Sequence, residues 1–169
     1  GGTTADICKI DLSGKAEILN KVEIVTMCDI DNPMYGPTGA SHIFGPQKGA
    51  DEAMVLELDE GIKNLSRAIT EAIGKDISEV PGTGAAGAMG AGMIAFFGSR
   101  LQMGIQTVLD TVKFDEMISD ADYIITGEGK LDSQSLRGKV VIGIAERAKK
   151  QDKNVIAVVG GADDAEIDK

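Results

Sequence analysis

Residues 123–139 read Tyr-Ile-Ile-Thr-Gly-Glu-Gly-Lys-Leu-Asp-Ser-Gln-Ser-Leu-Arg-Gly-Lys. The apolar run at their start is typical of a strand, and an amphipathic stretch follows them, so we expect the chain to leave a strand here and enter a helix. In open parallel sheets, ligands bind beyond the carboxyl ends of the strands. That position holds two carboxylates, Glu128 and Asp132, among glycines that let a ligand approach the backbone. This segment is the first candidate for a functional site.

The same segment lies inside a strand–helix–strand pattern. We expect a strand at 122–126, a helix at about 136–150 and a second strand at 155–159. A crossover helix lets two strands run parallel, so this pattern predicts a parallel βαβ unit and an α/β fold.

Upstream, the pattern predicts a strand within 21–30 and a long amphipathic helix over 50–73. Between them, residues 31–49 hold three prolines and four glycines, a composition typical of an ordered functional loop. Short helices are expected near 102–109 and 114–119. The helix over 50–73 is predicted from apolar residues spaced three or four apart, namely Met54, Leu58, Ile62, Leu65, Ile69 and Ile73.

Composition excludes several classes of function. The formal net charge of −10 and the 4% of aromatic residues argue against nucleic-acid binding, because a basic patch and stacking platforms are both missing. No apolar run is long enough for a membrane span. Cys8 and Cys28 show neither zinc spacing nor a disulfide framework, which favours a reducing, cytoplasmic setting.

Residues 82–87, Gly-Thr-Gly-Ala-Ala-Gly, have the G-x-G-x-x-G spacing but follow a polar stretch, whereas a dinucleotide fingerprint follows a strand. Two other interpretations stay open. The small residues of 82–98 form rows that let a helix pack closely on a neighbour, or the glycine-rich helix start offers backbone N–H groups to an anion.

Four motifs occur in order along the chain. They are Cys-Asp-Ile-Asp-Asn-Pro at 28–33, Phe-Gly-Pro-Gln-Lys-Gly-Ala at 44–50, Pro-Gly-Thr-Gly-Ala-Ala-Gly-Ala-Met-Gly-Ala-Gly at 81–92, and Ile-Thr-Gly-Glu-Gly-Lys-Leu-Asp-Ser-Gln at 125–134. Together they resemble the type I glycerate kinases, and the resemblance extends over essentially all of the 169 residues.

The resemblance implies a two-domain α/β fold in which one domain is inserted into a Rossmann-like domain. Residues 1–118 resemble the later part of the inserted domain, and 119–169 resemble part of the Rossmann-like domain. The family's amino-terminal Ala-Pro-Asp-Ser-Phe-Lys-Gly segment and its Gly-Gly-Ser-Ala-Thr-Asn-Asp-Gly-Gly region do not occur in this sequence. We therefore expect an incomplete fold whose ends are cut from something longer, and whose partner is the remaining N-terminal part of the same enzyme.

The implied activity is transfer of the γ-phosphoryl group of ATP to a hydroxyl of D-glycerate, with Mg²⁺ as cofactor. The resemblance also implies a cytoplasmic location and is compatible with a homo-oligomer. We expect this chain alone to be inactive. The candidate catalytic residues are Asp132, Glu128 and Lys48, the first two also being candidate Mg²⁺ ligands. The candidate substrate- or nucleotide-binding residues are Asp29, Asp31, Asn32, Gln47, Gly82, Gly84 and Gly87.

Each candidate also has an ordinary structural explanation. Asp29, Asp31 and Asn32 suit a turn before Pro33, and Lys48 suits a solvated surface position. Glu128 and Asp132 suit helix capping or a turn. The alternative function is a binding module that captures small carboxylates or phosphates without turnover. A purely structural interaction domain is less favoured, because the two loops hold more polar residues than turns require.

Overall fold

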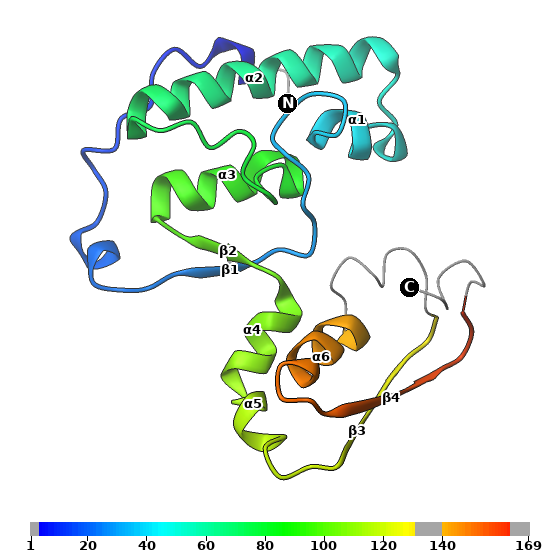
Figure 1. Ribbon diagram of the computed structural model, residues 1–169. Helices are drawn as coiled ribbons and strands as arrows, with labels where there is room; N and C mark the ends of the chain where they lie inside the picture. Colours follow the sequence, from blue (N-terminus) through cyan, green and yellow to red (C-terminus); the bar gives the residue numbers. More distant parts are fainter. Residues whose placement is uncertain (1–3, 131–139, 163–169) are drawn as a thin grey trace. The chain divides into compact units, whose positions relative to one another are not determined.

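The computed structural model describes residues 4–130 and 140–162. Its contacts divide the chain into two compact units, Gly1–Gln102 and Met103–Lys169 (Figure 1). The sequence predicts a different boundary, between residues 118 and 119, which would divide two domains of the complete enzyme. That boundary stays a prediction. In the described residues, each unit contains one two-stranded sheet together with helices, so the α/β class is confirmed in both.

In the first unit, two short parallel strands lie against helices. β1 and β2 pair with Val25 opposite Arg100, and the ladder continues where the Cys28 N–H donates to the Gln102 carbonyl at 2.9 Å. The elements of this unit are η1 (Thr4–Asp6), η2 (Glu17–Asn20), β1 (Val25–Met27), α1 (Ala40–Phe44), η3 (Pro46–Lys48), α2 (Glu52–Ile73), α3 (Ala85–Phe97) and β2 (Arg100–Gln102).

The predicted long helix is α2, and both of its ends are capped. The Asp51 carboxylate accepts a hydrogen bond from the Met54 N–H at 2.8 Å, and Gly74 ends the helix in the left-handed region with φ of 70°. Ile62 and Ile69 are buried as predicted, but Met54 is exposed and Val55 takes the buried position in the first turn. The prediction was wrong there because one apolar stripe cannot distinguish two adjacent apolar residues.

The core of the first unit lies between α2, α3 and the loop after β1. It is built from Met34, Ala40, Ile62, Ile69, Ile77, Ala88, Ala91 and Ala95. The alanines of α3 let it approach its neighbours closely, so the packing interpretation of the small-residue segment is confirmed for them.

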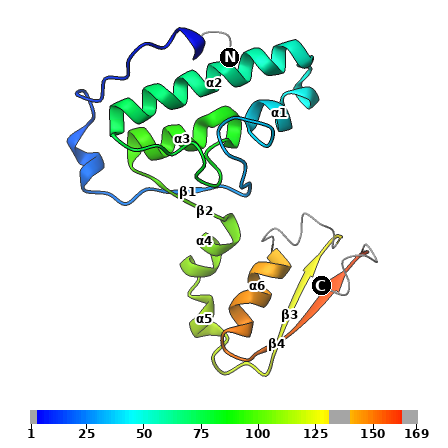
Figure 2. The same ribbon diagram turned by 45° about the horizontal axis from the view of Figure 1, so that its top comes forward.

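The second unit contains the predicted parallel pair, seen clearly in Figure 2. Its elements are α4 (Gly104–Thr111), α5 (Phe114–Met117), β3 (Tyr123–Glu128), α6 (Val140–Lys149) and β4 (Asn154–Val159). The predicted parallel pairing is confirmed for β3 and β4. That the pair belongs to the larger sheet of a Rossmann-like domain stays a prediction. β3 is longer than predicted and ends at Glu128, so Gly127 and Glu128 belong to the strand.

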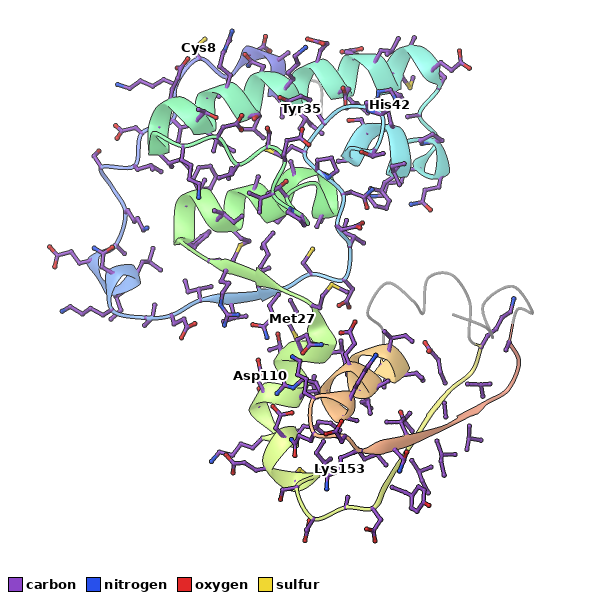
Figure 3. The ribbon with its side chains drawn as sticks, in the orientation of Figure 1. Cys8, Met27, Tyr35, His42, Asp110 and Lys153 are labelled. Carbon is purple, nitrogen blue, oxygen red and sulfur yellow. The ribbon has the colours of Figure 1, made fainter. Side chains whose placement is uncertain are left out.

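The helices of the second unit are joined by one arginine. Arg147 of α6 donates to both carboxylate oxygens of Asp115, at 2.9 and 2.7 Å, and to Asp110 of α4 at 2.7 Å. Figure 3 labels Asp110 on α4. The hydrogen bonds from Asp115 and then Asp110 raise the pKa of the Arg147 guanidinium further above its usual range, so its charge is permanent.

No helix within the described ranges has the length and apolar character that crossing a membrane requires.

Replacing Arg147 by Lys is expected to loosen α6 from α4 and α5. Lysine keeps the charge but loses the two-pronged contact with Asp115, so the local free energy of opening should fall by about 1–2 kcal/mol. Amide hydrogen exchange within α6 measures this opening. The matched control is Lys63→Ala, whose ion pair with Glu60 is exposed and worth less than about 0.5 kcal/mol. Equal exchange rates in wild type and Arg147→Lys would show that Arg147 does not fasten the helices.

Candidate functional site

The candidate site of the first unit begins where two loops are joined backbone to backbone. The Met34 N–H donates to the Ser78 carbonyl at 2.9 Å, and the Gly84 N–H donates to the Asn32 carbonyl at 3.0 Å. The buried Thr83 supports this arrangement, because its hydroxyl donates to the Val80 carbonyl at 2.7 Å. The loop after β1 is thereby held against the start of α3.

Two glycines are required here by close backbone contacts, and a third by its left-handed dihedral. A Cβ on Gly84 would overlap the Pro33 carbonyl oxygen, and a Cβ on Gly90 would overlap the Gly82 carbonyl oxygen. Gly82 has φ of 88°, and a Cβ there would lie 2.8 Å from the Cys28 sulfur. Gly82 and Gly84 therefore bring the backbone of one loop against the other, which is a packing role.

Gly87 is in a different situation. A Cβ on Gly87 would meet nothing within 4 Å. It belongs to a left-handed turn at the start of α3, in which Ala86, Gly87 and Ala88 have φ of 51°, 71° and 70°. Left-handed dihedrals are costly for alanine, so the surrounding structure imposes this turn. In the described part of the chain, no backbone carbonyl outside α3 accepts a hydrogen bond from the N–H groups of Ala86 and Gly87.

The turn forms one wall of a pocket of about 400 Å³. The end of β1, Phe44 and Lys48 also line it, and Met27 of β1 is labelled in Figure 3. Among the described residues that line it, Lys48 is the only cation and Asp29 the only anion. The lining residues are Thr26, Met27, Cys28, Asp29, Ile30, Phe44, Lys48, Ala85, Ala86, Gly87, Met89, Gly90 and Met93.

Lys48 reaches this pocket from a tight turn. It ends the short helix η3, and Gly49 follows with φ of 92°, a left-handed conformation that favours glycine. Lys48 is exposed and has no ion-pair partner within the described ranges. Its ammonium group is therefore available to an anionic ligand.

Of the site residues predicted in the first unit, three line the pocket and the others do not. Asp29, Lys48 and Gly87 line the pocket. Gly82 and Gly84 pack next to it, while Asp31 and Gln47 are exposed and Asn32 is half-buried outside the lining. The Asn32 side chain donates to the Thr38 carbonyl at 2.8 Å, which is the turn role that the sequence left open. The ligand-binding roles of all these residues stay predictions.

Glu128 belongs to the second unit and lies at the carboxyl end of β3. Its carbonyl accepts a hydrogen bond from the Gly160 N–H at 3.2 Å, which ties it to the end of β4. Its Oε2 atom is buried and has no hydrogen-bond partner among the described residues. The described residues contain no cluster of three or more potential metal-ligating side chains. The other predicted carboxylate, Asp132, lies outside the described residues.

The sequence interpretation missed the apolar wall of the pocket. Met27, Met89 and Met93 line it together with Phe44, and Met27 and Met89 are exposed. The sequence does show Met27 at the end of a predicted strand and Met89 and Met93 in the glycine-rich segment. From sequence alone, however, methionines that line a pocket cannot be distinguished from methionines of the core.

These features define a mixed α/β protein with parallel strands and a glycine-lined pocket. Comparison with known proteins then gives the family. The model of the glycerate kinase family matches residues 1–169, and this chain belongs to that family.

Individual relatives agree with this assignment. The glycerate 2-kinase of Escherichia coli is 46% identical over 164 residues, covering 97% of this chain and 43% of the relative. The glycerate kinase of Bacillus cereus is 48% identical over 160 residues, covering 95% of this chain and 42% of the relative. A solved structure of a glycerate kinase 2 from Salmonella typhimurium LT2 matches with a TM-score of 0.82 and 41% identity, covering 95% of this chain and 43% of that one. The chain thus spans less than half the length of these relatives.

Alanine substitutions at two glycines should separate the packing role from the open turn. Gly84→Ala is expected to lower the free energy of unfolding by about 2–3 kcal/mol, because the new Cβ overlaps Pro33. Gly87→Ala should cost only about 1 kcal/mol, the price of a left-handed alanine in open space. Urea denaturation of the two variants measures both values. If Gly84→Ala were as stable as wild type, the two loops would not be in close contact.

Proposed function

We propose that an enzyme of family length carrying this chain transfers the γ-phosphoryl group of ATP to a hydroxyl of D-glycerate, with Mg²⁺ as the cofactor. One observation gives the proposal its strongest support. In a chain whose relatives are named glycerate kinases, a single pocket brings together the Lys48 ammonium group and the open turn at the start of α3.

The residues of the pocket suit an anionic substrate. Phosphoryl transfer depends on positioning and on stabilising the charge of the transferred group rather than on covalent chemistry by the protein. Lys48 supplies a mobile positive charge for a phosphate or for the carboxylate of glycerate. Ala86 and Gly87 line the same pocket, so their backbone N–H groups would supply donors to an anion bound there, as N–H groups do at helix starts that bind phosphate.

Glu128 fits the metal requirement of this reaction. Magnesium is usually bound by one or two carboxylates together with water and substrate phosphates, so a protein cluster of three ligands is not needed. The buried Oε2 atom of Glu128, which has no hydrogen-bond partner in the described part of the chain, is a suitable hard oxygen donor. Bound Mg²⁺ would offset phosphate charge. Glu128 could instead accept the proton of the substrate hydroxyl, and Asp132 keeps the same two predicted roles.

A second candidate function is supported by the location of the pocket. All the residues that line it belong to the first unit, so the pocket needs no other part of a longer enzyme to form. The chain alone could therefore bind a small carboxylate or phosphate without turnover. A cytoplasmic location and a homo-oligomeric state stay predictions.

Activity should appear only in a protein of family length. We define the composite enzyme as the Escherichia coli glycerate 2-kinase in which this chain replaces the region that it matches. The composite enzyme is expected to form ADP and phosphoglycerate from ATP and D-glycerate. The chain alone should not, because transition-state positioning by two domains is lost when one is incomplete. A coupled ADP assay measures both. A folded composite enzyme that releases no ADP in response to glycerate would contradict the proposed reaction.

Replacing Lys48 by Met in the composite enzyme should impair substrate use without loss of stability. If Lys48 contacts a substrate anion, kcat/KM should fall by an amount equivalent to about 1.5–3 kcal/mol, the value of a charged hydrogen bond. The exposed side chain leaves no cavity, so Tm should change little. Lys63→Met, on the exposed face of α2, is the matched control. Unchanged kcat/KM for both glycerate and ATP would show that Lys48 contacts neither substrate and is an ordinary surface residue.

A further inference from the structure

One carboxylate of α2 contacts the loop that carries Lys48. The Asp59 side chain is only 14% exposed, and both of its oxygens accept the Gly36 N–H, at 3.0 and 3.1 Å. The His42 Nε2 atom of α1 lies 3.9 Å from the same carboxylate, and Figure 3 labels His42 beside α2. Asp59 therefore joins α2 to the turn before α1 and to α1 itself, and the hydrogen bond from Gly36 is the closer of the two contacts.

Helix formation does not explain an aspartate at this position. Asp59 lies about two turns into α2, beyond the first turn, where a carboxylate gains from the helix dipole. Aspartate is also a poor helix former in a helix interior. A shielded carboxylate is costly unless it is hydrogen-bonded, and hydrogen bonds to charged groups are the strong ones. The contact with Gly36 supplies that bond, and holding the loop is the role that accounts for Asp59.

Consecutive turns connect Gly36 to Lys48. The Gly39 N–H donates to the Gly36 carbonyl at 2.8 Å, and a Cβ on Gly39 would overlap the backbone four residues earlier. At the end of α1, the Gly45 N–H donates to the Ser41 carbonyl at 2.9 Å. The Lys48 N–H in turn donates to the Gly45 carbonyl at 2.9 Å. Because each turn is bonded to the one before it, a displacement of Gly36 is passed along the segment to Lys48.

We propose that Asp59 is a positioning residue of the pocket, which holds Lys48 in place through Gly36 and α1. Asp59 does not line the pocket, whereas Phe44 and Lys48 of the held segment do. The place of the ammonium group is therefore set from α2. The effect on substrate use rests on the proposed function, whereas the effect on the order of the segment does not.

Packing on α2 is the competing explanation. Gly45 lies so close to the buried Val55 that a Cβ on Gly45 would be 3.2 Å from the Val55 Cγ2 atom. If this contact alone fixed the segment, Asp59 would contribute to stability without affecting Lys48. The two explanations differ in what happens at Lys48 when the carboxylate is removed, so each test measures an effect at Lys48.

Nuclear magnetic resonance of the isolated chain tests the order of the segment without any reaction. Asp59→Ala should lower the backbone order parameters of Phe44 and Lys48 by at least ~0.1 from the rigid value of ~0.85, while those of α3 stay unchanged. Asp59→Asn keeps an oxygen that can accept the Gly36 N–H and should restore most of the order. The control Glu60→Ala removes the exposed neighbouring carboxylate and should change nothing. Unchanged order at Lys48 in Asp59→Ala would overturn the proposal.

A double-mutant cycle in the composite enzyme tests the effect on substrate use. Asp59→Ala alone should lower kcat/KM by ~10-fold, and Asp59→Asn by less than ~3-fold, since a neutral acceptor replaces a charged one. In the Lys48→Met background, Asp59→Ala should lower kcat/KM by less than ~2-fold, because the group that Asp59 positions is already gone. A merely structural role would give the same factor in both backgrounds. That result, or a wild-type kcat/KM in Asp59→Ala, would contradict the proposal.

Failure of the proposed function can be told apart from failure of this proposal. If the composite enzyme releases no ADP with Asp59 in place, the proposed reaction fails, and the order parameters alone decide the role of Asp59. If Asp59→Ala does not fold, Asp59→Glu replaces it, because it keeps the charge but moves the oxygens by one methylene group. Loss of order at Lys48 in Asp59→Glu supports the proposal, and full order there opposes it.

Discussion

The contact between Gly84 and the backbone of Asn32 and Pro33 determines the geometry of the first unit. The Gly84 N–H donates a hydrogen bond to the Asn32 carbonyl, and a side chain at Gly84 would overlap the Pro33 carbonyl. The end of β1 and the start of α3 are brought together by this contact, and both line the pocket. The left-handed turn at Ala86 follows within two residues. The position of this turn is thus a consequence of a packing constraint.

The second unit is held together by different physics. Arg147 fastens α6 to α4 and α5 through charged hydrogen bonds at the helix surface, while in the described ranges the sheet packs its apolar core against the α6 side. A charged contact of this kind fixes orientation, since the guanidinium plane has to match the carboxylate. It adds little hydrophobic stabilisation. The unit therefore has well-defined helices next to a sheet that is short of buried surface.

Much of the fold could be predicted from local patterns, and the exceptions have physical causes. The α2 helix and the β3–β4 pair were predictable because burial selects apolar residues at fixed spacing. β2 was missed because three residues, Arg100 to Gln102, carry too little alternation to indicate a strand. The left-handed turn at Ala86 contradicts the preference of alanine, so only its tertiary surroundings specify it. Motifs made Lys48 and Gly87 candidates, and both line the pocket, while the methionine wall depends on contacts between distant segments.

The pairing of β1 with β2 has a consequence for the order in which the molecule is built. Val25 finds its partner only at Arg100, after the loop, α2 and α3 have all been made. Pairings between segments far apart in sequence pay their chain-closure entropy before they gain stability, and they form slowly. On a translating ribosome, β1 must wait as an unpaired strand until residue 102 has emerged. The α2 helix, whose hydrogen bonds are local, can form earlier and offer a surface on which the rest assembles.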